Sequence, residues 1–312
     1  MISLDPRPAG ALALPLSPLT LGTSGWSPRS TVDNDATAAL AADWAAGRLG
    51  TKVIDSSNIY GDSHSEEVIG RALAGTVGAG LVVQTKLDRD LATNDFSASQ
   101  MERSLQQSLD RLGLPRVDVL FLHDPENVGF ESVMRPGGAV DALVAMRDRG
   151  VAGAIGISGG PVSMMRQFVD TGIFDVLINH NRFTLVDRSA TSLYQAARDR
   201  RMIVQNAAPF GAGILTGDPR FAGTYAYGPI RPQTQTAVDA ASRIAAEAGI
   251  PLAALALQFS LRHPLVDTTV VGLRTRERFD ETVAHAQIHV PDAVWAELDA
   301  IAPSSDIGVD AA

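Results

Sequence analysis

Four titratable residues follow short apolar runs in the first half of the chain. Asp55 ends VID, Tyr60 comes five positions later, Lys86 ends VVQTK and His123 ends VDVLFLH. Runs of this kind are typical of strands buried on both faces of a parallel sheet. The carboxyl ends of parallel strands meet at one edge, so we expect these side chains to gather there. Each alone could be a hydrogen-bonded strand-end residue, but four together favour a catalytic site.

These four groups suit proton transfer at a carbonyl or an alcohol. A tyrosine has an ordinary pKa of about 10, and a neighbouring lysine ammonium is expected to lower the pKa of Tyr60. Asp55 would hold Lys86 charged and oriented, while His123 would donate a hydrogen bond to a substrate oxygen. None of these groups carries a hydride, so a bound cofactor is expected to do so.

The sequence predicts no metal site and no dinucleotide-binding Rossmann domain. His285 and His289 are four apart, but they fall past the predicted helix end, and the glutamate of a zinc-protease motif is missing. Both are expected at the surface. A G-x-G-x-x-G motif does not follow the first strand.

A basic segment, VVGLRTRERFDET, follows the last predicted strand. It places Arg274, Arg276 and Arg278 at a strand end and helix start, where many barrels bind phosphate. A solvated helix start with Arg–Glu pairs is an equally good interpretation of this segment alone.

Composition indicates one ordered globular chain. The 312 residues are 45% hydrophobic, carry a net charge of −9 and include no cysteine, so disulfides and thiolate sites are excluded. Without a Lys/Arg run or a long apolar run, nucleic-acid and membrane partners are not expected. We expect a cytoplasmic protein that is a monomer or a small homo-oligomer.

Strand and helix patterns alternate eight times, which predicts a (β/α)₈ barrel as a single domain over residues 1–312. The first 22 residues hold four prolines and Asp5, so they suit a hairpin cap better than a signal peptide. S-x-x-E at Ser63 and Glu66 predicts a helix-capping box. The expected strands are 19–22, 51–57, 81–86, 118–123, 154–158, 176–180, 202–207 and 268–272. The expected helices are 35–46, 66–73, 97–112, 139–149, 161–170, 189–200, 234–248, 251–262, 276–284 and 292–301.

Several segments, in the right order, resemble motifs of the aldo-keto reductase family: DSSNIYGDSHSEEVIGRAL, VVQTKL, SLDRLGLPRVDVLFLHDPE, GAIGIS, APFGAGILTG and VVGLRTRERFDETV. The resemblance implies the barrel fold, Tyr60 as general acid/base supported by Asp55, Lys86 and His123, and a nicotinamide cofactor. NADP(H) is favoured over NAD(H) because of the arginines. The implied cofactor-binding residues are Gly22, Thr23, Asp55, Ser158, His180, Ala207, Phe210, Gly213, Leu215, Gly272, Arg274, Arg278, Glu281 and Thr282.

The chain departs from the family pattern at five cofactor positions. Gly159 replaces a usual asparagine, and His180 a usual glutamine, at the amide of the nicotinamide. Ala207 replaces a stacking tyrosine, Gly272 a phosphate-binding lysine and Thr282 a common asparagine. These departures leave NAD(H) open as the cofactor.

Shorter segments, HDPE, NRFTLVDRSA and YAYGPIRP, resemble the aldose dehydrogenases of that family, which oxidise a sugar to its lactone. Loops at the carboxyl ends of the strands shape a barrel pocket. Aromatic and hydrogen-bonding residues there suit a sugar: Trp26, Asn58, Asp124, Phe183 and Tyr227. Two alternatives remain open: a broad-specificity NADPH-dependent aldehyde and ketone reductase, and a regulatory subunit that senses the nicotinamide cofactor.

Overall fold

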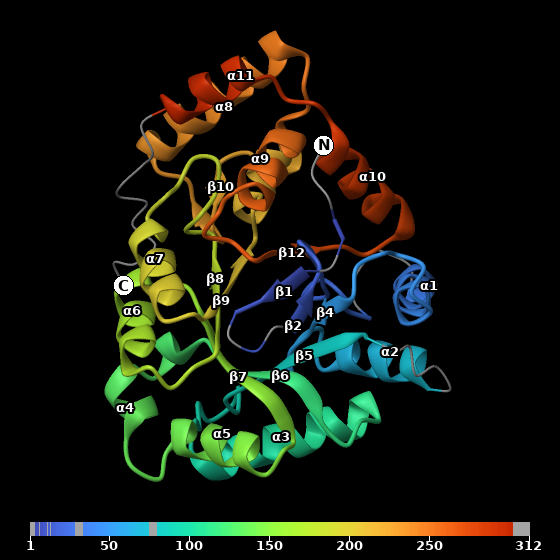
Figure 1. Cartoon of the computed structure of the whole chain (residues 1–312), viewed down its shortest axis with the longest axis vertical. Helices are drawn as coiled ribbons and strands as arrows, with labels where there is room; N and C mark the ends of the chain where they lie inside the picture. The colour runs from blue at the N-terminus through green and yellow to red at the C-terminus, as the bar shows by residue number, and fades with distance from the viewer. Residues whose placement is uncertain are drawn as a thin grey trace.

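A computed structural model describes residues 4–5, 7–10, 12, 14–28, 34–74 and 80–301 of the chain. Eight parallel strands close into a barrel in the order β12-β3-β4-β5-β6-β7-β8-β9 (Figure 1). The predicted (β/α)₈ barrel is therefore confirmed. The barrel strands are β3 (Leu19–Gly22), β4 (Val53–Asp55), β5 (Val82–Leu87), β6 (Val117–His123), β7 (Ala152–Gly159), β8 (Val176–His180), β9 (Ile203–Ala207) and β12 (Thr268–Gly272).

The strand register brings distant residues side by side at the carboxyl end of the barrel. His123 on β6 pairs with Ser158 on β7, and His180 on β8 pairs with Ala207 on β9. Because all eight strands run the same way, their last residues surround one opening.

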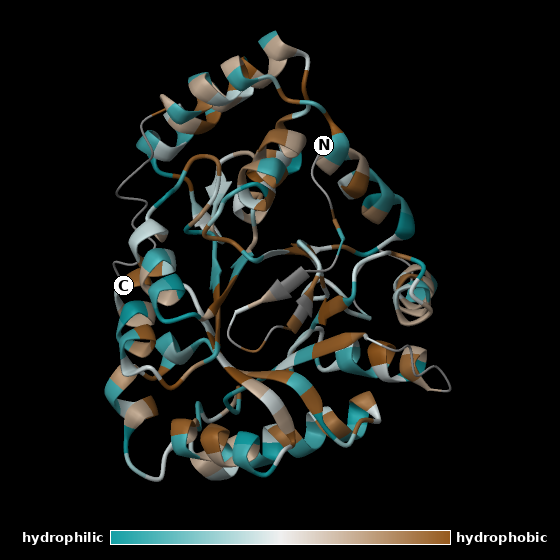
Figure 2. Ribbon diagram, in the orientation of Figure 1, coloured by the Kyte–Doolittle hydropathy of each residue, from teal (hydrophilic) through white to brown (hydrophobic). Residues whose placement is uncertain are grey.

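Helices surround this barrel, and all but the short helix Phe130–Met134, which was not predicted, begin and end close to the predicted positions. In α3, the Ser97 side chain accepts a hydrogen bond from the Gln100 amide, and Gly113 ends the helix at φ 65°. Figure 2 shows apolar residues concentrated on the strands, with mixed faces on the helices around them. The helices are α1 (Asn34–Ala45), α2 (His64–Leu73), α3 (Ala98–Leu112), α4 (Phe130–Met134), α5 (Ala139–Asp148), α6 (Val162–Thr171), α7 (Thr191–Asp199), α8 (Pro232–Ala248), α9 (Leu252–Leu261), α10 (Arg276–Gln287) and α11 (Asp292–Asp299).

The predicted capping box at the start of α2 is wrong. Ser63 adopts a left-handed conformation with φ 75° and its side chain caps no helix amide. Its hydroxyl donates instead to the carbonyl of Asn58. Glu66 is buried and accepts hydrogen bonds from Thr85 and Arg111. The glutamate is thus engaged by neighbouring elements and cannot reach back to its own helix start.

An antiparallel hairpin of β1 (Arg7–Ala9) and β2 (Leu14–Leu16) lies across the amino-terminal end of the barrel (Figure 1). Ala9 and Leu16 are buried in one cluster with apolar side chains from the starts of the barrel strands, including Val53, Val82 and Ile203. The hairpin therefore plugs this end, as the sequence predicted, and leaves the carboxyl end for a site.

A second, shorter hairpin stands over the carboxyl end and was not predicted. It consists of β10 (Thr224–Tyr225) and β11 (Gly228–Pro229), and the short helices η2 (Gly211–Thr216) and η3 (Pro219–Phe221) lead into it. Its turn residues Ala226 and Tyr227 both have positive φ, 49° and 70°. Glycine and asparagine are the usual residues in such a turn, so the sequence carried no hairpin signal here.

Among the described residues, no single helix is long and apolar enough to cross a membrane. Taken together, α8 and α9 have sufficient length and composition, but they are bent by 106° relative to each other.

Candidate active site

A cavity of about 1300 Å³ opens at the carboxyl end of the barrel. Its walls include all four residues of the predicted catalytic set: Asp55, Tyr60, Lys86 and His123. Three of them sit at or near the ends of β4, β5 and β6, and Tyr60 lies on the loop after β4. The parallel strands thus gather them as the sequence indicated.

Lys86 and Asp55 form a buried ion pair at the floor of this cavity. The Lys86 ammonium donates to both Asp55 carboxylate oxygens at 2.8 Å and to the Ser56 carbonyl at 2.7 Å. Three acceptors use the three N–H bonds of the ammonium. Gln84 donates a further hydrogen bond to Asp55 at 2.9 Å. This arrangement holds the ammonium at a fixed point, with its nitrogen 4.6 Å from the centre of the Tyr60 ring.

The pKa of Tyr60 is raised and not lowered, contrary to the prediction made from the neighbouring Lys86. Burial raises the pKa of Tyr60 well above 10, and the carboxylates of Asp55, Asp124 and Asp88 raise it further. Asp55 neutralises the one nearby ammonium, so the surroundings of the phenol are net negative. A positive charge brought into the cavity would favour the phenolate.

Asp88, which orients His123, was not predicted, because no sequence motif marks it. Asp88 lies just after β5, is buried, and places Oδ1 2.6 Å from His123 Nδ1. Its other oxygen accepts a hydrogen bond from the Ser57 hydroxyl, and its backbone is held by Ser104. The Nε2 atom of His123 then points toward the cavity, where Asp124 lies 3.6 Å away.

Two carboxylates favour the charged form of His123. Burial by itself lowers the pKa of a histidine, but the charges of Asp88 and Asp124 and the hydrogen bond with Asp88 outweigh it and raise the pKa of His123. A positively charged imidazole is a stronger hydrogen-bond donor to a substrate oxygen than a neutral one.

A polar cluster lies beside His123 on the wall of the cavity. Donor atoms of Asp124, Glu126 and His180 lie within 4.8 Å of one another, a spacing that could also suit a metal ion. Burial lowers the pKa of His180 to about 4, so its ring is neutral at pH 7. Its Nδ1 lies 3.3 Å from the Asn181 amide nitrogen, which leaves Nε2–H facing Asp124. One oxygen each of Asp124 and Glu126 is buried without a hydrogen-bond partner among the described residues.

All but two of the predicted cofactor-binding residues line the same cavity, in a groove that runs from Ser158 to Glu281. Thr23 is buried and donates to the carbonyl of Asp55, so it braces the β3–β4 edge instead. Leu215 is fully buried in the hydrophobic core. His285, which was expected past the end of its helix, lies within α10 and lines the groove.

At the far end of the groove, two of the three arginines of the basic segment differ in their pairing. Arg278 is paired with Glu281 at 2.6 Å. The side chain of Arg274 is exposed, lies against Gly25 and forms no ion pair or hydrogen bond with a residue that the structure describes. Arg274 is thus the cation at this end that is open to a ligand.

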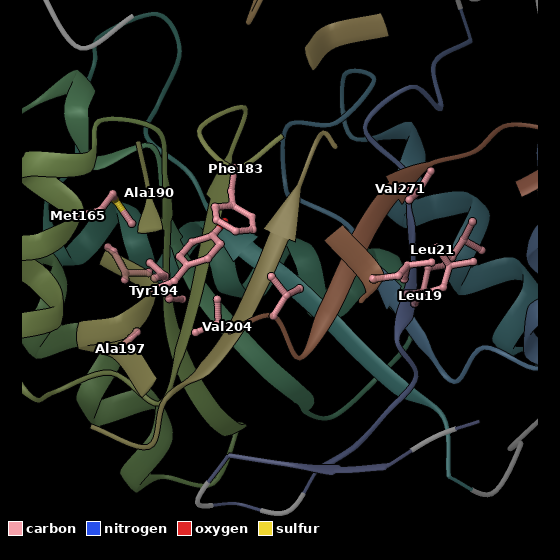
Figure 3. Close-up of a cluster of buried hydrophobic side chains, with 14 of the residues drawn as sticks. Leu19, Leu21, Met165, Phe183, Ala190, Tyr194, Ala197, Val204 and Val271 are labelled. Carbon is pink, nitrogen blue, oxygen red and sulfur yellow. The ribbon is translucent and has the colours of Figure 1, made fainter. Parts of the chain in front are cut away.

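Of the five predicted substrate-binding residues, only Asp124 and Tyr227 line the cavity. The other three are turned into the protein. Trp26 is fully buried and donates to the Leu273 carbonyl at 2.6 Å, and Asn58 donates to the Ser104 carbonyl and the Ser108 hydroxyl on α3. Phe183 packs in the core against Tyr194, as Figure 3 shows, and against Phe259.

Comparisons with known proteins identify the family of the chain. The model of the Aldo/keto reductase family matches residues 18–303. The D-threo-aldose 1-dehydrogenase of a Pseudomonas species is 29% identical, with 96% of this chain and 97% of that protein covered. The L-galactose dehydrogenase of Arabidopsis thaliana is 28% identical, with 91% and 88% covered.

Among solved structures, the holo form of an aldo-keto reductase from Bacillus halodurans has the same fold. It superposes with a TM-score of 0.76 at 18% identity and covers 96% of this chain and 97% of its own. The family match extends over nearly the whole chain and includes every strand of the barrel and all four residues of the catalytic set. The chain therefore belongs to the aldo/keto reductase family, whose members use NAD(P)H, and it is an oxidoreductase.

Proposed function

We propose that the protein oxidises an aldose at its anomeric carbon and releases a lactone. The observation that carries this proposal is the cavity wall beside His123, which the carboxyl groups of Asp124 and Glu126 line and where one oxygen of each has no hydrogen-bond partner among the described residues. Sugar hydroxyls supply hydrogen-bond donors. A pocket built to bond hydroxyls rejects analogues that lack them, which gives sugar specificity. The sugar substrates named for the related aldose and galactose dehydrogenases support the same class.

The residues of the groove fit a nicotinamide dinucleotide. Gly213 has φ 112°, a conformation in which glycine is favoured, so the backbone can approach a pyrophosphate closely there. Arg274, which pairs with no carboxylate among the described residues, supplies a cation for a phosphate at the far end, and Ser158 and His180 would hold the nicotinamide end. We infer that NADP(H) is favoured over NAD(H), because no carboxylate in the described part of the chain competes with a 2′-phosphate for Arg274.

In the proposed reaction, NAD(P)⁺ held by the residues of the groove would supply the acceptor for the hydride of the anomeric carbon. Tyr60 removes the proton of the anomeric hydroxyl, and a positive charge in the cavity would offset the carboxylates that raise the pKa of the phenol. Lys86, which Asp55 holds at a fixed position, would stabilise the phenolate. His123, held by Asp88, donates a hydrogen bond to the same substrate oxygen as negative charge develops on it.

A panel of sugars tests the proposal. L-Fucose, D-arabinose and L-galactose are incubated with NAD⁺ and NADP⁺, while absorbance of the reduced cofactor and acid released by lactone opening are followed together. We expect equal amounts of both products from at least one aldose. Reduction of simple aromatic aldehydes without oxidation of any aldose would instead show a carbonyl reductase. Tight cofactor binding with no turnover at all would show a cofactor-sensing subunit.

A further inference from the structure

Two glutamine side chains, Gln84 on β5 and Gln205 on β9, meet inside the barrel beneath the catalytic set. In the closed order of eight strands, β5 and β9 stand four places apart, so the two residues come from opposite walls. Both side chains are fully buried. A buried amide costs free energy unless its N–H and C=O groups are hydrogen-bonded, so each glutamine here needs partners.

The alternation of side chains along the strands places this pair in the middle of the barrel interior. On β5, Val82 belongs to the apolar cluster at the amino-terminal end and Lys86 lines the cavity, and Gln84 lies between them. On β9, Gln205 likewise follows Ile203 of the apolar cluster by two positions. The pair therefore lies between the apolar cluster and the floor of the cavity.

Each of the two amides determines the orientation of the other. Gln84 Nε2 donates to Gln205 Oε1, and Gln205 Nε2 donates to Gln84 Oε1, both at 2.9 Å. The second N–H of Gln84 donates to Asp55 Oδ1, also at 2.9 Å. The ion-paired carboxylate of Asp55 can only accept, so Gln84 must turn its N–H₂ group toward it. Gln205 must then take the complementary orientation, and the network has one consistent arrangement.

The bond from Gln84 adds something that Lys86 cannot supply. Both bonds from Lys86 to Asp55 come from one flexible side chain, so alone they would let carboxylate and ammonium shift together. The bond from Gln84 ties Asp55 to the barrel interior instead. The ammonium nitrogen lies 4.6 Å from the centre of the Tyr60 ring, and the interaction of charges in a buried site depends strongly on their separation.

We propose that Gln84 is a positioning residue for proton transfer: it fixes the Asp55 carboxylate, and Gln205 fixes Gln84. Through Asp55 and Lys86, the pair of glutamines holds the positive charge beside the Tyr60 phenol. The inference rests on the proposed function in one respect, because it assigns the proton transfer to Tyr60. It does not depend on the substrate, since oxidation of a sugar and reduction of an aldehyde use the same proton transfer.

The first test removes the donor to Asp55 with little change in side-chain length. In Gln84→Met, the single-turnover rate with the best aldose of the panel, or the best aldehyde if no aldose reacts, should fall by about tenfold or more. This is the scale of one lost hydrogen bond to a charged group. The dissociation constant of the cofactor should stay within about twofold, because neither glutamine lines the cavity.

A double variant separates positioning from stability. Gln84→Met leaves the Gln205 amide unpaired and should destabilise the fold, whereas Gln84→Met with Gln205→Met replaces both amides by apolar groups of similar shape. Urea denaturation should therefore show that the double variant regains stability over the single one. Its turnover rate should nevertheless stay as low as in Gln84→Met. A purely structural role of the pair would restore the rate together with the stability.

A conservative variant tests the part played by Gln205. Burial favours the protonated form of a carboxyl group, which offers an O–H and a C=O as the amide does. Gln205→Glu should thus keep the reciprocal pair and a rate within about twofold of wild type, while Gln205→Met should lose about fivefold, the scale of a bond between neutral groups. The matched control is Thr20→Val, which breaks a buried hydroxyl pair with Thr268 in the same barrel and should leave the rate unchanged.

The position of the ammonium can also be followed without turnover, because the chain has only two lysines, Lys52 and Lys86. In protein labelled with ¹⁵N-lysine, the buried Lys86 ammonium with its three acceptors should exchange protons slowly with water and give a sharp NMR cross-peak. Gln84→Met should broaden this cross-peak, and Thr20→Val should not.

The outcomes separate this inference from the proposed function. If wild type turns over neither sugars nor aldehydes, the proposed function fails, and the Lys86 cross-peak still tests whether Gln84 positions the ion pair. A cross-peak in Gln84→Met as sharp as in wild type would overturn the inference. So would a rate in Gln84→Met within about twofold of wild type.

Discussion

The ring of His123 lies between two carboxylates, with Asp88 at Nδ1 and Asp124 near Nε2. Lys86, Tyr60 and His180 complete the titratable groups around it, and Glu126 stands one step further along the wall. Asp88 is the partner with direct hydrogen-bond geometry, at 2.6 Å. The charge of His123 at neutral pH therefore depends chiefly on Asp88.

Asp88→Asn should lower the pKa of His123, which NMR titration of the ring measures directly. Because the pKa of His123 is raised in the folded state, its protonation stabilises the fold fully below the unfolded pKa of about 6.5. This stabilisation is lost as pH rises through the folded pKa. The variant should thus lose more unfolding free energy at pH 6 than at pH 9. Asp118→Asn removes a carboxylate whose one hydrogen-bond donor among the described residues is the Val83 amide, so the unfolding free energy lost in this control should be the same at both pH values. An unchanged His123 titration would show that Asp88 has no electrostatic role.

Individual residues differ in how well the sequence predicts their position and role in the site. Strand ends are fixed by the sheet, so Asp55, Lys86 and His123 could be placed together from pattern alone. Asp88 lies in the polar loop segment DRD, where no local signal distinguishes a histidine partner from a solvated aspartate. Trp26 and Phe183 were wrongly predicted to bind the substrate. The sequence does not distinguish a loop aromatic that points into the protein from one that points into the cavity.

At the scale of elements, the β10–β11 hairpin carries Tyr227 over the cavity. Tyr227 is 75% exposed, and its ring centre lies 6.0 Å from that of His180. Tyr225 anchors the hairpin, because its hydroxyl donates to the Asn181 carbonyl at 3.0 Å and lies 2.9 Å from the Thr184 hydroxyl. Two consecutive residues with positive φ hold the Tyr227 side chain at a local conformational cost of about 1–3 kcal/mol each.

Tyr225→Phe should loosen this hairpin and raise the KM for the sugar by about tenfold, the equivalent of one lost hydrogen bond. Cofactor affinity should stay within about twofold, because phenylalanine keeps the ring that packs against Gly211, beside the predicted cofactor-binding residue Phe210. Steady-state kinetics and cofactor titration measure the two effects. Tyr194→Phe is the matched control: its buried hydroxyl bonds to Asn206, away from the cavity, so it should cost stability without changing KM. An equal rise of KM in both variants would rule out a lid role.

The sequence predicted the long elements well and the short ones poorly. Each barrel strand carries an apolar run, and the burial of that run in the barrel determines its conformation. β10 and β11 have two residues each, and their Ala–Tyr turn lacks glycine and asparagine. Only packing of Tyr225 into the protein determines this hairpin. The three-residue extension of α10 that brings His285 into the groove is a boundary error of ordinary size.

In the molecule as a whole, the amino-terminal end of the barrel contributes stability and the carboxyl end carries the candidate active site. The β1–β2 hairpin and the starts of the strands form an apolar cluster at the amino-terminal end, while the ionisable residues occupy the carboxyl end. Stability and chemistry can therefore be altered independently, as in other barrels of this kind.

Leu16→Ala should lower the free energy of unfolding by about 2–5 kcal/mol, because the side chain is fully buried in the plug. Urea denaturation measures the loss. The folded variant should keep the cofactor affinity and turnover of wild type, since the plug is at the opposite end from the site. A variant as stable as wild type, or one with impaired cofactor binding, would mean that the two ends are not separate.

The central claim is that Tyr60 transfers the proton while a bound nicotinamide takes the hydride. The most direct test is the single-turnover rate of cofactor reduction by the best sugar of the panel, in wild type and Tyr60→Phe. The rate should fall by ~10²–10⁴-fold, the usual contribution of a general acid or base, with an unchanged dissociation constant for the cofactor. Tyr194→Phe should keep the wild-type rate. A Tyr60→Phe rate within about twofold of wild type would contradict the account.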